Sequence, residues 1–150
     1  MYMGELVRLV IERFVKEGLI LGGKGSDLLS SSQRFYTKYV SEIESDPVGQ
    51  YNNCKQIMIE LGLGHATEQD CINIRFICEC ISRRAAHLVS AALCTLIRRI
   101  DEPHIVVGID GSVYKFHPHF HNLMTEKISQ ILGPELKVSL DGSRTRLTFV

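Results

Sequence analysis

The stretch that decides the fold reads HIVVGIDGS at residues 104–112. Its first six residues are mostly apolar and rich in β-branched side chains, the pattern of a central strand covered on both faces. Asp110-Gly111 is a tight-turn dipeptide, so the strand is expected to end there. Ligands favour the carboxyl ends of strands in α/β sheets, where a glycine lets the backbone approach them closely. Because Asp-Gly also ends many strands for turn reasons alone, a ligand site and a plain turn both stay open.

The residues after this turn predict a crossover unit. Residues 112–116, SVYKF, can continue as a short strand. Pro118 is expected to open a helix that runs through Leu132, and the Gly-Pro pair at 133–134 is expected to close it. Residues 136–140, LKVSL, then predict another strand. The order strand, turn, helix, strand implies a crossover unit beside a largely helical half.

The sequence before residue 104 has a helical pattern. Apolar residues spaced three and four apart predict an amphipathic helix over 3–17, and shorter helices are expected at 36–45 and 50–61. A threonine N-cap with an acidic first turn at 67–70 begins a pattern without Gly or Pro that continues to about residue 99. Its small apolar residues at 85–92 indicate a helix buried on several sides. The fold class is therefore α/β and mostly helical.

Composition excludes several classes of function. The 17 Lys+Arg and 17 Asp+Glu give a formal net charge of +0, which argues against a general nucleic-acid binder. No run of 18 apolar residues occurs, so no transmembrane segment is predicted, and the first residues lack the layout of a secretory signal. Five cysteines without framework spacing indicate reduced, mostly packed thiols. Together these features predict a cytoplasmic protein.

Two motifs suggest chemistry but fit ordinary structural roles better. Residues 22–26, GGKGS, lack the preceding strand and the Gly-Lys-Ser/Thr ending that a Walker loop needs, so a surface turn is predicted. His117 and His121 are one helical turn apart, but zinc needs a third protein ligand, and no Glu follows at a metalloprotease spacing. No metal ligand and no catalytic residue is predicted.

Four separated stretches, in the same order, resemble the carboxyl-terminal part of a eukaryotic, insect-like hexokinase. The resemblance covers about residues 1–140 and implies a large-lobe portion of the actin-like, ribonuclease-H-like ATPase fold. It also implies a parent activity, the ATP-dependent phosphorylation of the 6-hydroxyl of glucose or a related hexose, with Mg²⁺ bound mainly through ATP. The four stretches are MYMGELVR at 1–8, YTKYVSEIESD at 36–46, RRAAHL at 83–88 and VGIDGSVYKFHPHF at 107–120.

The resemblance further implies which residues contact the nucleotide. Met1 would lie at the edge of the adenine pocket. Thr37 and Ser41 are four residues apart, so both hydroxyls fall on one helix face, and Lys38 can offer a cation to phosphate. The implied set is Met1, Thr37, Lys38, Tyr39, Val40, Ser41, Asp110, Gly111, Ser112, Val113, Tyr114, Lys115 and Phe116.

Parts of the family pattern do not occur in the 150 residues. The Asp-Leu-Gly-Gly-Thr phosphate loop, the catalytic aspartate and the carboxylates of the sugar site would lie upstream of Met1, and residues 141–150 diverge from the family's glycine-rich ending. Phosphoryl transfer depends on positioning and electrostatics, so residues 1–150 are expected to form a partial domain, inactive alone. The alternatives are a non-catalytic binding or regulatory piece, which keeps partial nucleotide contacts or docks on an intact hexokinase lobe, and a truncated product without activity.

Overall fold

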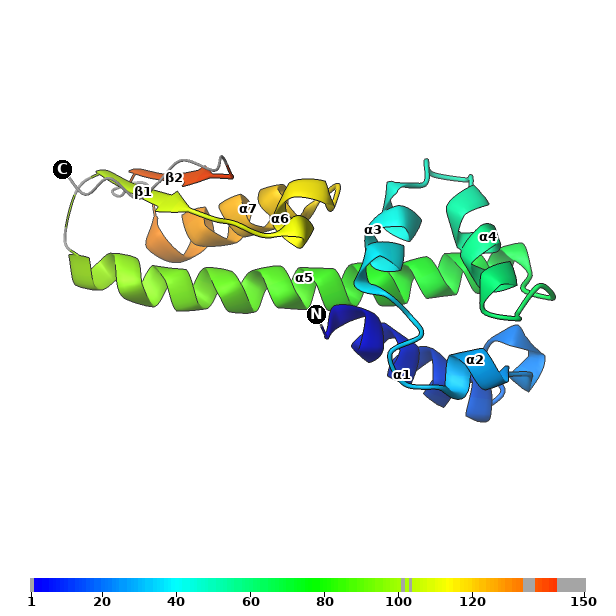
Figure 1. The fold of residues 1–150 in the computed structure, drawn as a ribbon. Helices are drawn as coiled ribbons and strands as arrows, with labels where there is room; N and C mark the ends of the chain where they lie inside the picture. Colours follow the sequence, from blue (N-terminus) through cyan, green and yellow to red (C-terminus); the bar gives the residue numbers. More distant parts are fainter. Residues whose placement is uncertain (1, 101, 103, 134–136, 143–150) are drawn as a thin grey trace. The chain divides into compact units, whose positions relative to one another are not determined.

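The computed structural model of the protein describes residues 2–100, 102, 104–133 and 137–142. The chain forms two compact units, Met1–Ser82 and Arg83–Val150, and each is described by itself. The helix α5 (Glu68–Ile100) contributes its first half to the first unit and its second half to the second (Figure 1).

The first unit consists of helices joined by short loops. The helices predicted over 3–17, 36–45 and 50–61 are confirmed to within two residues at each end, and the predicted surface turn at 22–26 includes a 3-10 turn. A short helix that the sequence did not predict begins after Ser26, whose hydroxyl accepts a hydrogen bond from the Leu29 N–H at 3.0 Å. The elements are α1 (Met3–Lys16), η1 (Leu21–Gly23), α2 (Asp27–Ser30), α3 (Thr37–Ser45), α4 (Asn52–Glu60) and the first half of α5.

The core of the first unit collects the apolar stripes of these helices. On α1 the stripe repeats every four residues at Val7, Ile11 and Val15, as an amphipathic helix requires. The predicted packing of thiols is confirmed for four of the five cysteines, because Cys80 is exposed. The other buried residues of this core include Leu21, Leu29, Phe35, Val40, Ile43, Cys54, Ile57, Met58, Leu63, Cys71, Ile74 and Cys78.

Helix α5 begins at the predicted cap. The Thr67 hydroxyl accepts a hydrogen bond from the Asp70 N–H at 3.2 Å, and the Asp70 carboxylate accepts one from the Thr67 N–H at 2.9 Å. This reciprocal pair is a capping box. Helix α5 is long and apolar enough to cross a membrane by length and composition alone. The core helix of a soluble protein meets the same two criteria, so the absence of a transmembrane segment stays a prediction.

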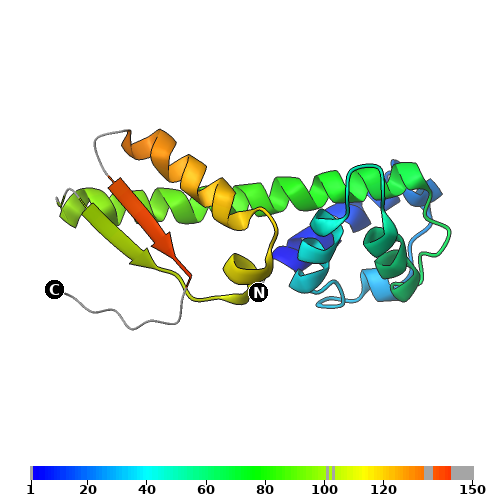
Figure 2. The ribbon, with the colours of Figure 1, turned by 90° about the horizontal axis from the view of Figure 1, so that it is seen from above.

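The second unit holds the predicted crossover. β1 (His104–Gly108) and β2 (Lys137–Asp141) pair in parallel, with His104 opposite Lys137 and Gly108 opposite Asp141 (Figure 2). After β1, the chain runs through α6 (Ser112–Phe116) and α7 (Phe120–Leu132) before it reaches β2. Gly133 ends α7 with a φ of 77°, a conformation that glycine adopts without strain.

Two predictions about this crossover are wrong. Residues 112–116 form α6 instead of a strand, because the Lys115 and His117 N–H groups donate to the carbonyls four residues earlier. These local bonds outweigh the β propensity of SVYKF, and they bury Tyr114. Pro118 lies in a turn, and α7 begins two residues later at Phe120.

The predicted burial of β1 and of residues 85–92 on several sides is also wrong for the described residues. In β1, Ile105 is buried whereas Val106 is 70% exposed. On α5, Ala86 and Ser90 are buried, whereas Leu88 is exposed. Figures 1 and 2 show the second half of α5 on one side of the two strands, so each element buries one face only.

Candidate functional site

The first group of implied nucleotide residues lies on α3. Thr37 is the first residue of this helix, and its hydroxyl accepts a hydrogen bond from the Gly4 N–H at 3.4 Å. Ser41 follows one turn later and is half-buried. Lys38 is exposed, and its ammonium nitrogen lies 5.2 Å from the centroid of the Tyr39 ring. Two hydroxyls and one cation are thus carried by two turns of one helix.

Tyr39 and Val40 face the core. Val40 is completely buried, and the Tyr39 ring makes edge contacts with the Phe35 and Tyr36 rings. The Tyr39 hydroxyl donates to the Glu60 carboxylate at 3.0 Å. Burial and then this carboxylate raise the pKa of Tyr39 above its usual value. These two side chains therefore hold α3 in place.

The entry to α3 depends on a glycine that the sequence did not single out. A Cβ at Gly4 would lie 2.2 Å from the carbonyl oxygen of Phe35 and 2.8 Å from the Thr37 nitrogen. The backbones of α1 and of residues 35–37 thus pass in direct contact. A glycine inside an amphipathic helix is the signal that could have revealed this contact.

A buried arginine fixes the loop that leads to α3. The Arg8 guanidinium donates to the Leu29 carbonyl at 2.9 Å and to the carboxylates of Glu5 at 2.8 Å and Glu12 at 2.9 Å. Glu5 also accepts from the Gln33 N–H at 2.9 Å. The hydrogen bond from Arg8 is the largest cause that holds the pKa of Glu5 below its usual value. This network ties α1 to residues 29–33.

The far end of α3 is held equally firmly. The Asp46 carboxylate accepts hydrogen bonds from the Asn53 and Cys54 N–H groups at 3.1 Å each, which satisfies the exposed donors at the start of α4. The buried Glu44 carboxylate accepts from the Ser82 hydroxyl at 2.7 Å. Both ends of the helix that carries Thr37–Ser41 are therefore fixed.

The second group of implied residues follows β1 in the second unit. Asp110 is exposed, and its carboxylate lies 2.7 Å from the ammonium of Lys115. The Tyr114 hydroxyl lies 2.5 Å from Nδ1 of His121. Gly111 and Ser112 are exposed, Val113 is half-buried, and Phe116 is 77% exposed.

This second group lies at the predicted edge of the sheet. Since β1 and β2 run in parallel, Gly108 and Asp141 are register partners at their carboxyl ends. The Ile109 N–H donates to the Asp141 carbonyl at 2.8 Å, which extends the pairing up to the turn at Asp110 and Gly111. Such an edge is where ligands bind in α/β sheets.

The implied residues thus fall into two groups, one in each unit, and Met1 lies outside the described residues. Among the described residues, no group of three or more His, Cys, Asp or Glu side chains is arranged to hold a metal ion. The expectation of no metal ligand stays a prediction.

Comparisons with known proteins point to one family. A sequence model described as hexokinase matches residues 1–146. The hexokinase of Brugia malayi is 41% identical over 145 residues, which cover 94% of this chain and 25% of that protein. Hexokinase-2 of Homo sapiens is 38% identical over 138 residues, which cover 88% of this chain and 15% of that protein. The chain spans a quarter or less of the length of these two relatives.

Solved structures give the same result for the fold. A hexokinase from Schistosoma mansoni complexed with glucose matches 94% of this chain and 32% of its own, with a TM-score of 0.88 and 31% identity. A second hexokinase crystal structure matches 95% of this chain and 32% of its own, with a TM-score of 0.77 and 18% identity. The predicted fold class is confirmed: the chain has part of the actin-like ATPase fold, mostly helical with a small parallel sheet.

Proposed function

This chain belongs to the hexokinase family, and from that membership we propose that it forms the ATP-binding side of a hexokinase. The parent enzyme would transfer a phosphoryl group from ATP to the 6-hydroxyl of glucose or a related hexose, as a step of glycolysis. The observation that carries the proposal is the placement of Thr37, Lys38 and Ser41 on two turns of one firmly held helix.

The donor set fits the phosphates of a nucleotide. Phosphate oxygens accept hydrogen bonds from hydroxyl and ammonium groups, and the exposed Lys38 supplies a positive charge. In the second unit, exposed backbone at Gly111 and Ser112 allows close approach at the carboxyl edge of the sheet. ATP would bring Mg²⁺ with it, and the ion would supply charge neutralisation of the phosphates.

We further propose that the chain is the carboxyl-terminal part of the large lobe and is inactive alone. The 150 residues contain no Asp-Leu-Gly-Gly-Thr segment. A general base alone contributes about 10²–10⁴-fold to a rate, so a chain without the family's catalytic aspartate would be slower by about that factor. The insect-like character of the motifs and a cytosolic location, or one at the mitochondrial outer surface, belong to the same proposal.

Calorimetry and an enzyme assay test these statements separately. Titration with Mg-ATP should give saturable heat, and Lys38→Gln should weaken binding about tenfold. The matched control is Lys55→Gln, an exposed lysine on α4 outside the implied set. A coupled assay for glucose 6-phosphate should give no turnover. No heat at millimolar Mg-ATP would refute the nucleotide site, and robust turnover would refute the claim of inactivity.

A second candidate function is docking on an intact hexokinase lobe. It is favoured by an apolar stripe on α5 formed by four exposed residues, Leu88, Val89, Leu96 and Ile100. Leu96→Glu should abolish co-sedimentation with an intact hexokinase, whereas Thr95→Glu, one position away, should not. Absence of any complex with the unaltered chain would reject this candidate.

A further inference from the structure

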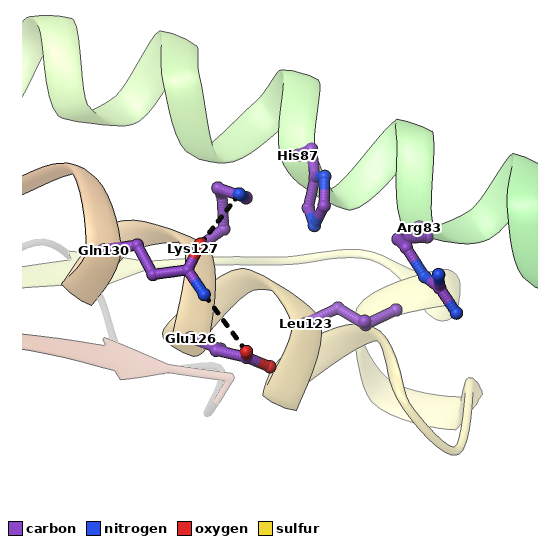
Figure 3. Close-up of a pocket in the computed structure, with 6 residues that line it drawn as sticks. All are labelled: Arg83, His87, Leu123, Glu126, Lys127 and Gln130. Carbon is purple, nitrogen blue, oxygen red and sulfur yellow. Dashed lines mark hydrogen bonds between the residues drawn. The ribbon is translucent and has the colours of Figure 1, made fainter.

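A cavity of about 300 Å³ lies between α5 and α7 within the second unit. The two helices are joined there by specific contacts. The Ser90 hydroxyl donates to the Ala86 carbonyl of its own helix at 2.8 Å and also lies 3.3 Å from the Met124 carbonyl oxygen, and the Arg98 guanidinium donates to the Ile131 carbonyl at 2.8 Å. The residues that line the cavity are Arg83, His87, Leu123, Glu126, Lys127 and Gln130, and none belongs to the implied nucleotide set (Figure 3).

The lining brings two positive charges to one histidine. Arg83 and His87 are one turn apart on α5, and Lys127 comes from α7. Figure 3 shows the His87 ring projecting from α5 toward α7, with Arg83 to one side of it and Lys127 to the other. Among the described side chains, no ion pair joins Arg83 or Lys127 to a carboxylate.

Glu126, the one acidic residue in the lining, is hydrogen-bonded to Gln130 and not to either cation of the lining. The Gln130 amide donates to the Glu126 carboxylate at 3.1 Å, and the Lys127 ammonium donates to the Gln130 amide oxygen at 2.8 Å. A neutral amide therefore separates Glu126 from Lys127 along this chain of hydrogen bonds. Burial first, and then the charges of Lys127 and Arg83, lower the pKa of His87, while Glu126 opposes them less strongly. The neighbouring charges therefore oppose protonation of the His87 ring more than they favour it.

We propose that this cavity binds a small phosphate anion, either free phosphate or the phosphate group of a monoester, between Arg83, His87 and Lys127. The planar guanidinium of Arg83 matches phosphate geometry, His87 adds a donor from the same helix, and Lys127 adds one from α7. A cavity of about 300 Å³ is at the small end of ligand pockets, so the ligand is a small molecule. Leu123 offers an apolar wall to the carbon part of a monoester.

The test is an NMR titration of the full 150-residue chain with inorganic phosphate, in chloride at constant ionic strength. We expect the His87 ring signals to shift with saturation. Arg83→Gln and Lys127→Gln should each weaken phosphate binding about tenfold, because each removes a hydrogen bond between two charged groups, and such a bond contributes enough binding free energy to account for that factor. Glu126→Gln should strengthen it, because this change removes a like charge and keeps an acceptor for Gln130.

Arg84→Gln is the matched control, since Arg84 is exposed on the same helix and does not line the cavity. It should change the affinity less than twofold. Thermal melting of each variant checks that the fold is kept. Absence of a saturable shift, an equal loss in Arg84→Gln, or weaker binding in a folded Glu126→Gln chain would overturn the proposal. A parallel titration with glycerol phosphate separates the two sources: tighter binding than phosphate identifies a monoester, and equal or weaker binding identifies the free ion.

Discussion

Gly4 and Phe35 are in backbone contact, so closely that a Cβ at position 4 would lie 2.2 Å from the Phe35 carbonyl oxygen. The atom that blocks the Cβ belongs to the backbone, which a rotamer change cannot move aside. The contact joins α1 to the segment immediately before α3, and Thr37 accepts a hydrogen bond from the same Gly4. The position of the implied nucleotide helix therefore depends on the absence of one methyl group.

Gly4→Ala should lower the free energy of unfolding by about 2–3 kcal/mol, the upper part of the range for overpacking a tight site. Urea denaturation measures the change. Gly64→Ala is the control, since a Cβ there would meet the nearest atom, of Ile59, at an ordinary 3.7 Å. Equal stability of the Gly4→Ala and unaltered chains would show that α1 and residues 35–37 are not in this contact.

Arg8→Gln should cost about 2–3 kcal/mol of stability, because Arg8 is only 4% exposed and its removal takes a charged donor away from the Leu29 carbonyl and from the carboxylates of Glu5 and Glu12. Arg13→Gln is the comparison on the same helix. The Arg13 side chain is 73% exposed and its pair with Glu17 is worth about 0–1 kcal/mol. Similar losses in the two variants would contradict the central role of Arg8.

Asp70→Asn should destabilise the chain by about 1–3 kcal/mol at neutral pH. Burial tends to raise the pKa of Asp70, but hydrogen bonds from the Leu21 N–H at 2.7 Å and from Thr67 outweigh it, so the pKa lies below the usual value. The stabilising contribution is therefore present above the pKa of the unfolded chain and is lost as the pH falls through the lower, folded pKa.

Unfolding measurements between pH 7 and pH 2 should show the difference between Asp70→Asn and the unaltered chain shrinking toward the acid end. The exposed Asp27 provides the control, since Asp27→Asn removes an exposed carboxylate from a different helix, α2. A difference that stays constant with pH would mean that the charge of Asp70 does not contribute.

The titration of His87 should respond to its neighbours with opposite signs. Lys127→Gln removes a positive charge and should raise the pKa of His87, whereas Glu126→Gln removes a negative charge and should lower it further. Phosphate, if it binds as proposed, should raise the pKa of His87 in the unaltered chain. The pH dependence of the His87 ring signals in NMR spectra measures all three. Shifts of the same sign in the two variants would contradict the assigned surroundings.

The sequence predicted those parts of the fold whose causes are local. The capping residues at 67–70 and the run without Gly or Pro were enough to predict α5, and the order of elements predicted the parallel crossover. α6 was predicted wrongly, because five residues with β propensity contain no signal for the hydrogen bonds back to Gly111 and Val113. The secondary structure of so short a segment depends on its tertiary contacts, which cannot be read from the sequence of the segment.

In the candidate site, too, the sequence predicted the local features and missed those that depend on distant segments. The spacing of Thr37 and Ser41 predicted that they share a helix face, which depends only on helical geometry. The burial of Val40 and the contact at Gly4 depend on segments from elsewhere in the chain, and no spacing within α3 contains that information. The same holds for the cavity between α5 and α7, whose lining residues are up to 47 positions apart, from Arg83 to Gln130 (130 − 83).

The distribution of the cysteines has a practical consequence. Cys54, Cys71, Cys78 and Cys94 are buried and Cys80 is exposed, and burial raises the pKa of Cys94 and of Cys78. Because burial keeps a reagent away from the other four thiols, a maleimide dye should label the folded chain once, at Cys80, and the unfolded chain five times. Counting dye molecules by mass spectrometry would therefore report how much of the chain is folded, with no engineered tag.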